Sequence, residues 1–173
     1  MTDDIRHQIV ELLPRLRRFA CSLAGNLDEG DDLVQEACAR ALSNLDKWQP
    51  GTRLDSWMYR ITQNLWLDRI RAKKVRGEAV EIDVAVDIAG SDGRTVIEQR
   101  AALSVVNRAL GKLAEDQRIL VALICIDGRS YKEVAEQLGL PLGTVMSRLA
   151  RARKALHDAL EGHESSPLVT SEK

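Results

Sequence analysis

The chain has 173 residues and a formal net charge of −1; 45% of its residues are hydrophobic, but only 3% are aromatic. This length allows one domain or two small ones, and the apolar fraction is ample for an aliphatic core. No apolar run is long enough to cross a bilayer and the first residues form no signal peptide, so we expect a cytoplasmic protein without membrane insertion.

No group of residues in the sequence indicates catalysis or metal binding. The histidines are scattered and the cysteines lack C-x-x-C spacing, so we expect no metal site and no cofactor. Cys21, Cys38 and Cys125 lie in apolar helical contexts and are predicted to be reduced and buried, with a Cys21–Cys38 redox pair as the alternative. The chain has no phosphate-binding glycine loop and no nucleophile–base arrangement, so we do not expect an enzyme.

Apolar residues at helical spacing predict an all-α protein made of two small helical domains. Helices over residues 5–23, 30–45 and 54–74 form the first domain, residues 1–76. Pro14 predicts a kink or a restart in the first helix, which ends at Gly25-Asn26. The second helix turns one face to the core, with Leu33, Val34, Ala37, Ala41, Leu42 and Leu45. Its other face carries Asp32, Gln35, Glu36 and Arg40.

Residues 77–94 are predicted to form a flexible acidic linker between the domains. No Lys or Arg lies between Gly77 and Gly93, and the period-two alternation there would give a strand without a partner. We also consider that this linker folds against the basic faces of the free protein. Helices over 95–110 and 116–126 lead into a helix-turn-helix within the second domain, residues 95–161, and residues 162–173 are an expected disordered tail.

The helix-turn-helix segment carries its own local signals. Ser130 and Glu133 form a capping-box pattern, Gly139 supplies the turn, and Pro141 suits the start of the next helix. That helix has an apolar stripe for the core, Val145, Leu149, Ala152, Leu156 and Leu160. A separate stripe carries Thr144, Ser147, Arg148 and Arg151, flanked by Arg153 and Lys154. Hydroxyls beside arginines can bind phosphates and guanine edges, which favours DNA recognition over a merely solvated basic helix.

A second candidate surface begins at Trp48, which lies on a turn-rich loop beside basic residues. Stacking of an unpaired nucleobase on such an aromatic contributes roughly 1–3 kcal/mol per base. Arg53 follows, and Arg60 and Asn64 share one face of the next helix. The alternative interpretation is that Trp48 covers the three-helix core and Asn64 is only solvated.

Three segments of the chain resemble bacterial RNA polymerase sigma factors of the extracytoplasmic-function class, within the sigma-70 family: DDLVQEACARAL (31–42), WQPGTRLDSWMYRITQNLWLDRIR (48–71) and SYKEVAEQLGLPLGTVMSRLARARKAL (130–156). The resemblance extends from Leu13 to Leu160. It implies a sigma-2 and a sigma-4 domain joined by a linker that threads the RNA-exit region. It also implies a factor that binds core RNA polymerase and directs promoter recognition, melting and transcription initiation.

The resemblance also implies roles for individual residues. The β′ clamp of the polymerase would bind Asp32, Leu33, Gln35 and Glu36, with the β flap as a further contact. Single-stranded −10 DNA would bind Trp48, Arg53, Arg60, Asn64, Arg69 and Arg71. The −35 duplex would bind Thr144, Ser147, Arg148, Arg151, Arg153 and Lys154. A free factor of this kind is expected to be a monomer held by an anti-sigma factor.

Two other functions compete with this interpretation. A stand-alone helix-turn-helix regulator would bind a palindromic site as a dimer and would leave residues 48–71 without a purpose. A sigma-like decoy that binds a regulatory protein instead of DNA is poorly supported, because both basic faces are intact.

Overall fold

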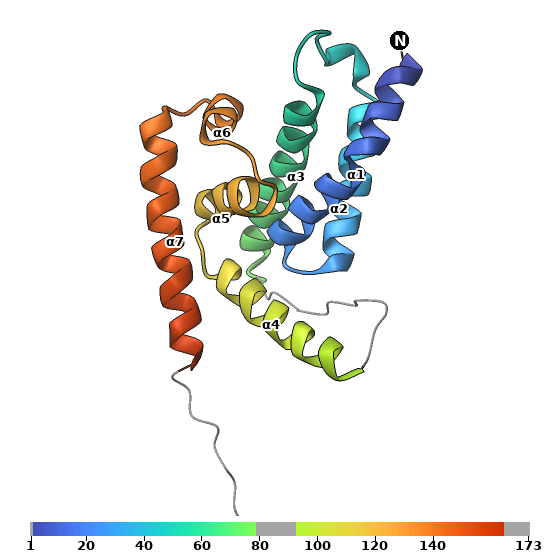
Figure 1. Ribbon diagram of the computed structural model, residues 1–173. Helices are drawn as coiled ribbons and strands as arrows, with labels where there is room; N and C mark the ends of the chain where they lie inside the picture. The colour runs from blue at the N-terminus through green and yellow to red at the C-terminus, as the bar shows by residue number, and fades with distance from the viewer. Residues whose placement is uncertain (1, 79–92, 165–173) are drawn as a thin grey trace, which may run out of the picture.

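Every regular element in the part of the chain that the structure describes is helical. The computed structural model describes the backbone of residues 2–78 and 93–164, and the side chains of residues 4–78 and 101–162. The elements are α1 (Thr2–Ala24), α2 (Leu27–Leu42), the 3-10 turn η1 (Leu45–Lys47), α3 (Leu54–Arg76), α4 (Gly93–Gly111), α5 (Glu115–Val121), the π-helical turn η2 (Ala122–Ile126), α6 (Tyr131–Leu138) and α7 (Leu142–Glu164). The predicted all-α class is confirmed (Figure 1).

Several predicted boundaries move. Helix α1 runs through Pro14 without restarting. Helix α1 ends at Ala24, directly before Gly25-Asn26 as predicted, but α2 begins at Leu27, earlier than predicted, because the Asn26 side-chain oxygen accepts the Glu29 N–H at 2.8 Å and caps it. Most of the predicted linker, and with it the idea that the linker folds on the basic faces, falls outside the described residues. The predicted tail starts too early, since α7 continues to Glu164.

Helices α1, α2 and α3 pack on one another and enclose an aliphatic core with a few aromatic rings. Of the predicted inward residues of α2, Leu33, Val34, Ala37 and Ala41 are buried, whereas Leu42 is 45% exposed and Leu45 is half-buried in η1. The prediction for Leu42 is wrong because α2 ends at Leu42 and the chain turns away into η1. Phe19 and Tyr59 meet with their ring centroids 4.9 Å apart, so α1 and α3 are joined by an aromatic pair.

In the C-terminal half, α4, α5 and α6 all contact the long helix α7. The predicted apolar stripe of α7 faces them, with Val145, Leu149 and Ala152 buried. Gly139 ends α6 with a φ of +64°, in the left-handed region that favours glycine, so the predicted turn is confirmed. No helix in the described residues is both long and apolar enough to span a membrane.

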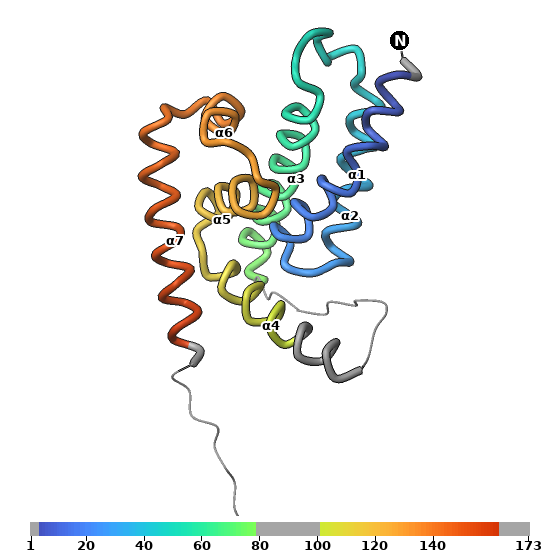
Figure 2. Tube along the Cα trace, viewed as in Figure 1, coloured from blue at the N-terminus to red at the C-terminus, as the bar shows by residue number. Residues whose placement is uncertain are grey.

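The two halves share one apolar core instead of standing apart. Turn η2 packs on α1, and buried residues from both halves belong to a single cluster. Figure 2 shows α5 and η2 lying between the N-terminal helices and α7.

The three cysteines are free thiols. Burial raises the pKa of Cys21 and of Cys38. Cys125 is exposed, contrary to expectation.

Helices α1 and α2 approach each other most closely at Gly30. A Cβ atom added there would lie 2.4 Å from the Cys21 sulfur and 2.8 Å from the Cys21 Cα. Because the second of these atoms is backbone, the contact cannot be relieved by rotating a side chain. Gly30 is therefore required by packing.

We predict that Gly30→Ala lowers the free energy of unfolding by about 1–3 kcal/mol, since overfilling a packed contact forces the two helices apart. Urea denaturation followed by circular dichroism measures this. Gly143→Ala is the control, because a Cβ there meets nothing within 4 Å. An equal loss in the free energy of unfolding for both variants would show that a Cβ atom at position 30 fits between α1 and α2.

The predicted capping box at the start of α6 is confirmed. Ser130 Oγ accepts the Glu133 N–H at 3.2 Å, and the Glu133 carboxylate accepts the Ser130 N–H at 2.9 Å. The Ser130 N–H first, and then Arg53, which also donates to this carboxylate, lower the pKa of Glu133 from 4.5 to about 2. The same side chain thus caps α6 and binds a cation from α3.

Because its pKa is lowered by folding, Glu133 stabilises the protein above pH 4.5, and this contribution is lost as the pH falls toward 2. Glu133→Gln keeps a hydrogen-bonding side chain without the charge. The parent should therefore be more stable than the variant at about pH 6, with the difference shrinking toward about pH 3. Urea denaturation across this range measures it; a difference independent of pH would contradict the assignment.

Candidate nucleic-acid interface

The predicted DNA-reading residues of α7 lie away from its buried stripe. Thr144 and Arg148 are half-buried, whereas the others are exposed: Ser147, Arg151, Arg153 and Lys154. Their positions follow from helical spacing, because the residues between them, such as Val145 and Leu149, face the core. The sequence pattern therefore placed hydroxyls and cations on one accessible side of a helix.

The polar contacts on this face are few and long. Arg148 Nη1 lies 3.6 Å from the Asp116 carboxylate on α5. Arg151 Nε donates to the Ser147 carbonyl at 3.4 Å, and Ser147 Oγ donates to the Thr144 carbonyl at 3.1 Å. Arg148 is thus steadied by a partly exposed carboxylate, while Arg151 remains open to an anion.

A cavity of about 360 Å³ lies at the start of α3. Its lining combines aromatic, basic and polar residues: Lys47, Trp48, Gln49, Thr52, Arg53, Ser56, Trp57 and Arg60. Trp48 is half-buried: it packs against the core and also lines the cavity. The two interpretations of Trp48, as a stacking platform and as a cover for the core, are therefore compatible. Its indole Nε1 is buried without a partner. An aromatic wall beside cations is suited to a nucleobase and its phosphate.

Sequence reasoning missed Trp57 as a member of this cavity. Trp57 is half-buried and packs against the core as well as lining the cavity, and its position three residues after Leu54 gives no local signal of the second role. The remaining cavity residues on the loop before α3 carry no such signal, because a loop has no periodicity from which a face can be read.

The predicted −10 residues do not form one cluster. Trp48, Arg53 and Arg60 line the cavity, and Asn64 is exposed one turn further along α3. Arg69 and Arg71 lie beyond them; Arg71 is about 16 Å from Arg60 along the helix axis. Arg69 binds Glu36 at 2.7 Å, and Arg71 binds Asp68 at 2.9 Å.

Three of the four residues of α2 that were predicted to bind the polymerase are accessible to a partner. Asp32, Gln35 and Glu36 are exposed. Leu33 is fully buried in the core and has no exposed surface with which to bind a partner, so that assignment is corrected. Helical spacing explains this, since Leu33 shares the inward face with Ala37.

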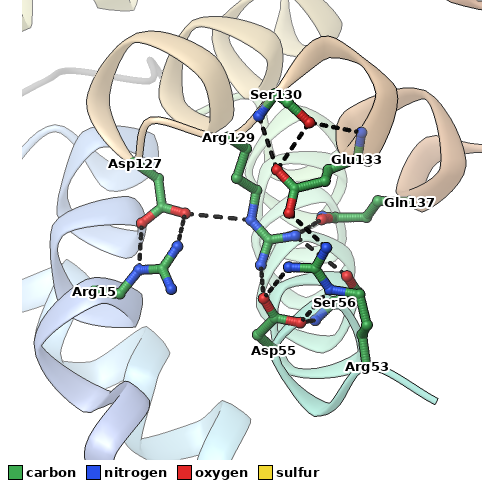
Figure 3. A network of polar contacts seen from close by, with 9 residues as sticks. All are labelled: Arg15, Arg53, Asp55, Ser56, Asp127, Arg129, Ser130, Glu133 and Gln137. Carbon is green, nitrogen blue, oxygen red and sulfur yellow. Dashed lines mark hydrogen bonds and ion pairs between the residues drawn. The ribbon is translucent and has the colours of Figure 1, made fainter. Parts of the chain in front are cut away.

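A buried polar network that the sequence did not reveal joins the two halves (Figure 3). Arg129, on the turn before α6, donates to the Asp55 carboxylate at 2.7 Å and to Asp127 at 3.2 Å. Asp127 in turn accepts two hydrogen bonds from Arg15 of α1, at 3.0 and 3.2 Å. We call Arg15, Asp55, Asp127 and Arg129 the Arg129 cluster. It links α1, α3 and the turn between η2 and α6.

The surroundings of the cluster keep its charges in place. Burial opposes ionisation of Asp55, but hydrogen bonds from Arg53 and the charge of Arg129 outweigh it and lower the pKa of Asp55. Burial raises the pKa of Tyr59, whose ring lies 4.2 Å from the Arg129 guanidinium carbon. At neutral pH, therefore, an ionised carboxylate and a neutral aromatic ring flank a buried guanidinium.

Arg118 of α5 is a second buried arginine between the halves. It donates to the Ser22 carbonyl at 3.0 Å and lies over the Trp66 ring at 5.7 Å. Burial lowers its pKa to about 10, and its Nη2 has no hydrogen-bond partner among the described residues. Unlike Arg129, it has no carboxylate among the hydrogen-bond partners that this part of the chain supplies.

The comparisons with known proteins agree with this arrangement. Residues 9–76 match sigma-70 region 2, and residues 103–156 match sigma-70 region 4. These are transcription-initiation regions and not enzyme families. The extracytoplasmic-function (ECF) sigma factor EcfG of Rhodopseudomonas palustris is 38% identical over 90% of this chain and 84% of its own length. SigW of Bacillus subtilis, also an ECF sigma factor, is 33% identical over 84% of this chain and 83% of its own.

Two solved structures share the fold. RpoE of Bartonella quintana, solved with the anti-sigma factor NepR, has a TM-score of 0.73 and 32% identity, covering 91% of this chain and 97% of its own. CnrH, solved with the cytosolic domain of CnrY, has a TM-score of 0.68 and 24% identity, covering 94% and 90%. With both sigma-70 regions in order and relatives that match over most of their length, the chain belongs to the extracytoplasmic-function sigma factors of the sigma-70 family.

Proposed function

We propose that this sigma factor reads promoters with two surfaces, the cavity at the start of α3 and the exposed face of α7. As a sigma factor, the protein binds core RNA polymerase and directs promoter recognition, melting and transcription initiation. We assign polymerase and −10 binding to residues 1–76, the linker to residues 77–94 and −35 binding to residues 95–161. One observation carries the proposal: each surface combines accessible cations with groups that can read or stack bases.

At the −10 element, the cavity would take a base from the non-template strand. Unstacking a base costs a few kcal/mol, and a preformed aromatic pocket offsets this only for a base that fits. Trp48 and Trp57 supply the aromatic walls, and Arg53 and Arg60 supply cations for the adjoining phosphates. Asn64 follows on α3, where an exposed amide can donate to and accept from a base edge, and Arg69 and Arg71 continue the basic track.

At the −35 element, α7 would enter the major groove. Arg148 and Arg151 can bind guanine edges, Thr144 and Ser147 can bind phosphates or bases, and Arg153 and Lys154 add phosphate contacts. The exposed face of α7 would hold the −35 duplex while the cavity at the start of α3 holds an unpaired −10 base. One factor would therefore determine both where the promoter is bound and where it melts.

The partners follow from the family and from the exposed surfaces. Asp32, Gln35 and Glu36 would bind the β′ clamp of the polymerase, and the C-terminal half would bind the β flap. RpoE of Bartonella quintana was solved with the anti-sigma factor NepR, which supports such a partner for this chain, and we propose that the free factor is a monomer. The polymerase performs the chemistry in the cytoplasm, and no cofactor is needed by the factor itself.

The test is run-off transcription with purified core polymerase, the purified chain and a genomic promoter library, read by sequencing transcript 5′ ends. Discrete start sites preceded by a shared two-part motif are expected. A chain that yields no specific transcripts and does not co-elute with core polymerase would favour the stand-alone regulator.

Trp48→Ala should reduce open-complex formation roughly five- to 150-fold, which corresponds to the loss of about 1–3 kcal/mol of base stacking. Binding to core polymerase should stay near the parental value, because the polymerase-binding face lies on α2. Permanganate footprinting measures melting, and Trp48→Phe is the matched variant, since it keeps an aromatic ring. If Trp48→Ala melts promoters as well as the parent, Trp48 does not capture a base.

Arg148→Ala should weaken discrimination between the intact and a scrambled −35 element by roughly five- to 150-fold, the value of one good arginine–guanine contact of about 1–3 kcal/mol. Transcription from the two promoters measures it. Arg108→Ala is the control, because Arg108 is an exposed arginine on α4 whose side chain donates to Ser104 of the same helix. Equal discrimination by parent and Arg148→Ala would place the readout elsewhere.

A further inference from the structure

Two large apolar side chains are exposed on α7, beside the residues proposed to bind the −35 element. Leu142 is 48% exposed and Met146 is 51% exposed, and they lie one turn apart at the start of the helix. Neither side chain belongs to the apolar core that the described residues form. The packing of the protein therefore gives no reason for their apolar character, and a ligand of this face has to be considered.

The charge of α7 favours nucleic acid as that ligand. Residues 142–157 contain three arginines and one lysine but no Asp or Glu. Arg151 and Lys154 are exposed, and so is Ser147 between Met146 and Arg148. A face with several cations and no carboxylate of its own attracts a polyanion. The exposed apolar pair is thus surrounded by groups that bind phosphates and bases.

The line of α7 farthest from the core carries only small side chains. Gly143, Ser147 and Ala150 follow one another at spacings of four and three residues, and all are exposed. Each lies two positions before a residue of the buried stripe, which is about 200° around the helix. Small side chains on this line let the backbone of α7 come close to the floor of a groove. Longer side chains on either side of it, Met146 and Arg151, then reach the base edges.

Met146 is placed to contact a base and not only the DNA backbone. In a helix-turn-helix, the N-terminal residues of the second helix contact base edges in the major groove, and Met146 lies four residues after the first residue of α7. Ser147 and the arginines match the polar groups of the groove. The C5 methyl of thymine is the apolar group that a base pair presents there. A flexible, polarisable thioether side chain adapts well to such a group.

We infer that Met146 reads a thymine of the −35 element by contact with its C5 methyl group. Arg148 and Arg151 select by hydrogen bonds, and Met146 adds an apolar selection that hydrogen bonds do not supply. The −35 element therefore holds a thymine, on one strand or the other, that the protein distinguishes by its methyl group. The inference rests on the proposed function, because that function assigns the exposed face of α7 to the −35 duplex.

The experiment removes the methyl group and the side chain, first separately and then together. Core polymerase with the full chain, as the parent or as Met146→Ala, transcribes a promoter identified by run-off transcription. Each thymine of its −35 element is replaced in turn by deoxyuridine, which pairs in the same way and lacks only the C5 methyl. Competition between the thymine and the uracil template in one reaction measures the preference.

With the parent, replacement of one particular thymine should lower template use about fourfold, which corresponds to the burial of one methyl-sized group at about 0.8 kcal/mol. With Met146→Ala, the same replacement should have no effect, because the side chain that meets the methyl is gone. Such a double-mutant cycle isolates the contact between the two groups. Met146→Leu should keep a preference for thymine, since it keeps a large apolar side chain.

Val10→Ala is the matched control, because it truncates an exposed apolar side chain on α1, away from α7. This variant should keep the full preference of the parent for thymine. Circular dichroism checks that all variants fold, which truncation of an exposed side chain is expected to permit.

Three results would overturn the inference: an equal preference for thymine in the parent and in Met146→Ala, a parent indifferent to every uracil replacement, and a −35 element without an A·T pair. If Met146→Ala lowers transcription equally from intact and scrambled −35 elements, Met146 contacts the polymerase and not DNA. Failure of the proposed function gives a different result, since the parent itself would then use intact and scrambled −35 elements equally.

Discussion

A guanidinium buried away from water is stabilised by carboxylates that pair with it, and the buried Arg129 has two of them where the two halves meet. One of its carboxylates, Asp55, lies at the start of α3, and the other, Asp127, lies on its own turn. Because Asp127 is also bound by Arg15 of α1, the pairing fixes where the C-terminal half meets the N-terminal half. The packing of η2 on α1 and the cover over the start of α3 follow from it.

The two nucleic-acid surfaces are affected differently by this contact. The buried stripe of α7 packs against its own half of the protein, so the cations on its other face stay exposed. Helix α3 turns Arg53 and Arg60 toward α6, so its cations are bound.

The two buried arginines between the halves differ in how their charges are balanced. Arg129 has carboxylates, hydroxyl and amide partners and an aromatic ring, so its charge is balanced inside the protein. Arg118 has one carbonyl and the face of Trp66, and its pKa falls to about 10. Replacing a buried ion pair by well-packed apolar side chains is often neutral or stabilising, so the charges of Arg129 and Arg118 are not explained by stability alone.

Most of the helices, the capping box at Ser130 and the turn at Gly139 were determined by the sequence alone, because each depends on residues within a few positions of one another. The same holds for the accessible side of α7, which helical periodicity separates from the core. Helical periodicity placed Leu33 on the inward face, whereas the family resemblance assigned it to a partner, and the structure shows it in the core. Leu42 lies at the end of its helix, where the inward face stops.

Tertiary structure alone decided the cavity around Trp48 and Trp57 and the Arg129 cluster. Arg129 and Asp55 are 74 positions apart, and Arg15 and Asp127 are 112 apart, so no local pattern can pair them. In the sequence, Arg129 is one polar residue on an Asp-Gly-Arg turn, indistinguishable from a solvated one. Only the folded chain shows that it is buried. The reason is physical: helix formation is governed by near neighbours, whereas burial of a charge is governed by whatever the whole chain brings around it.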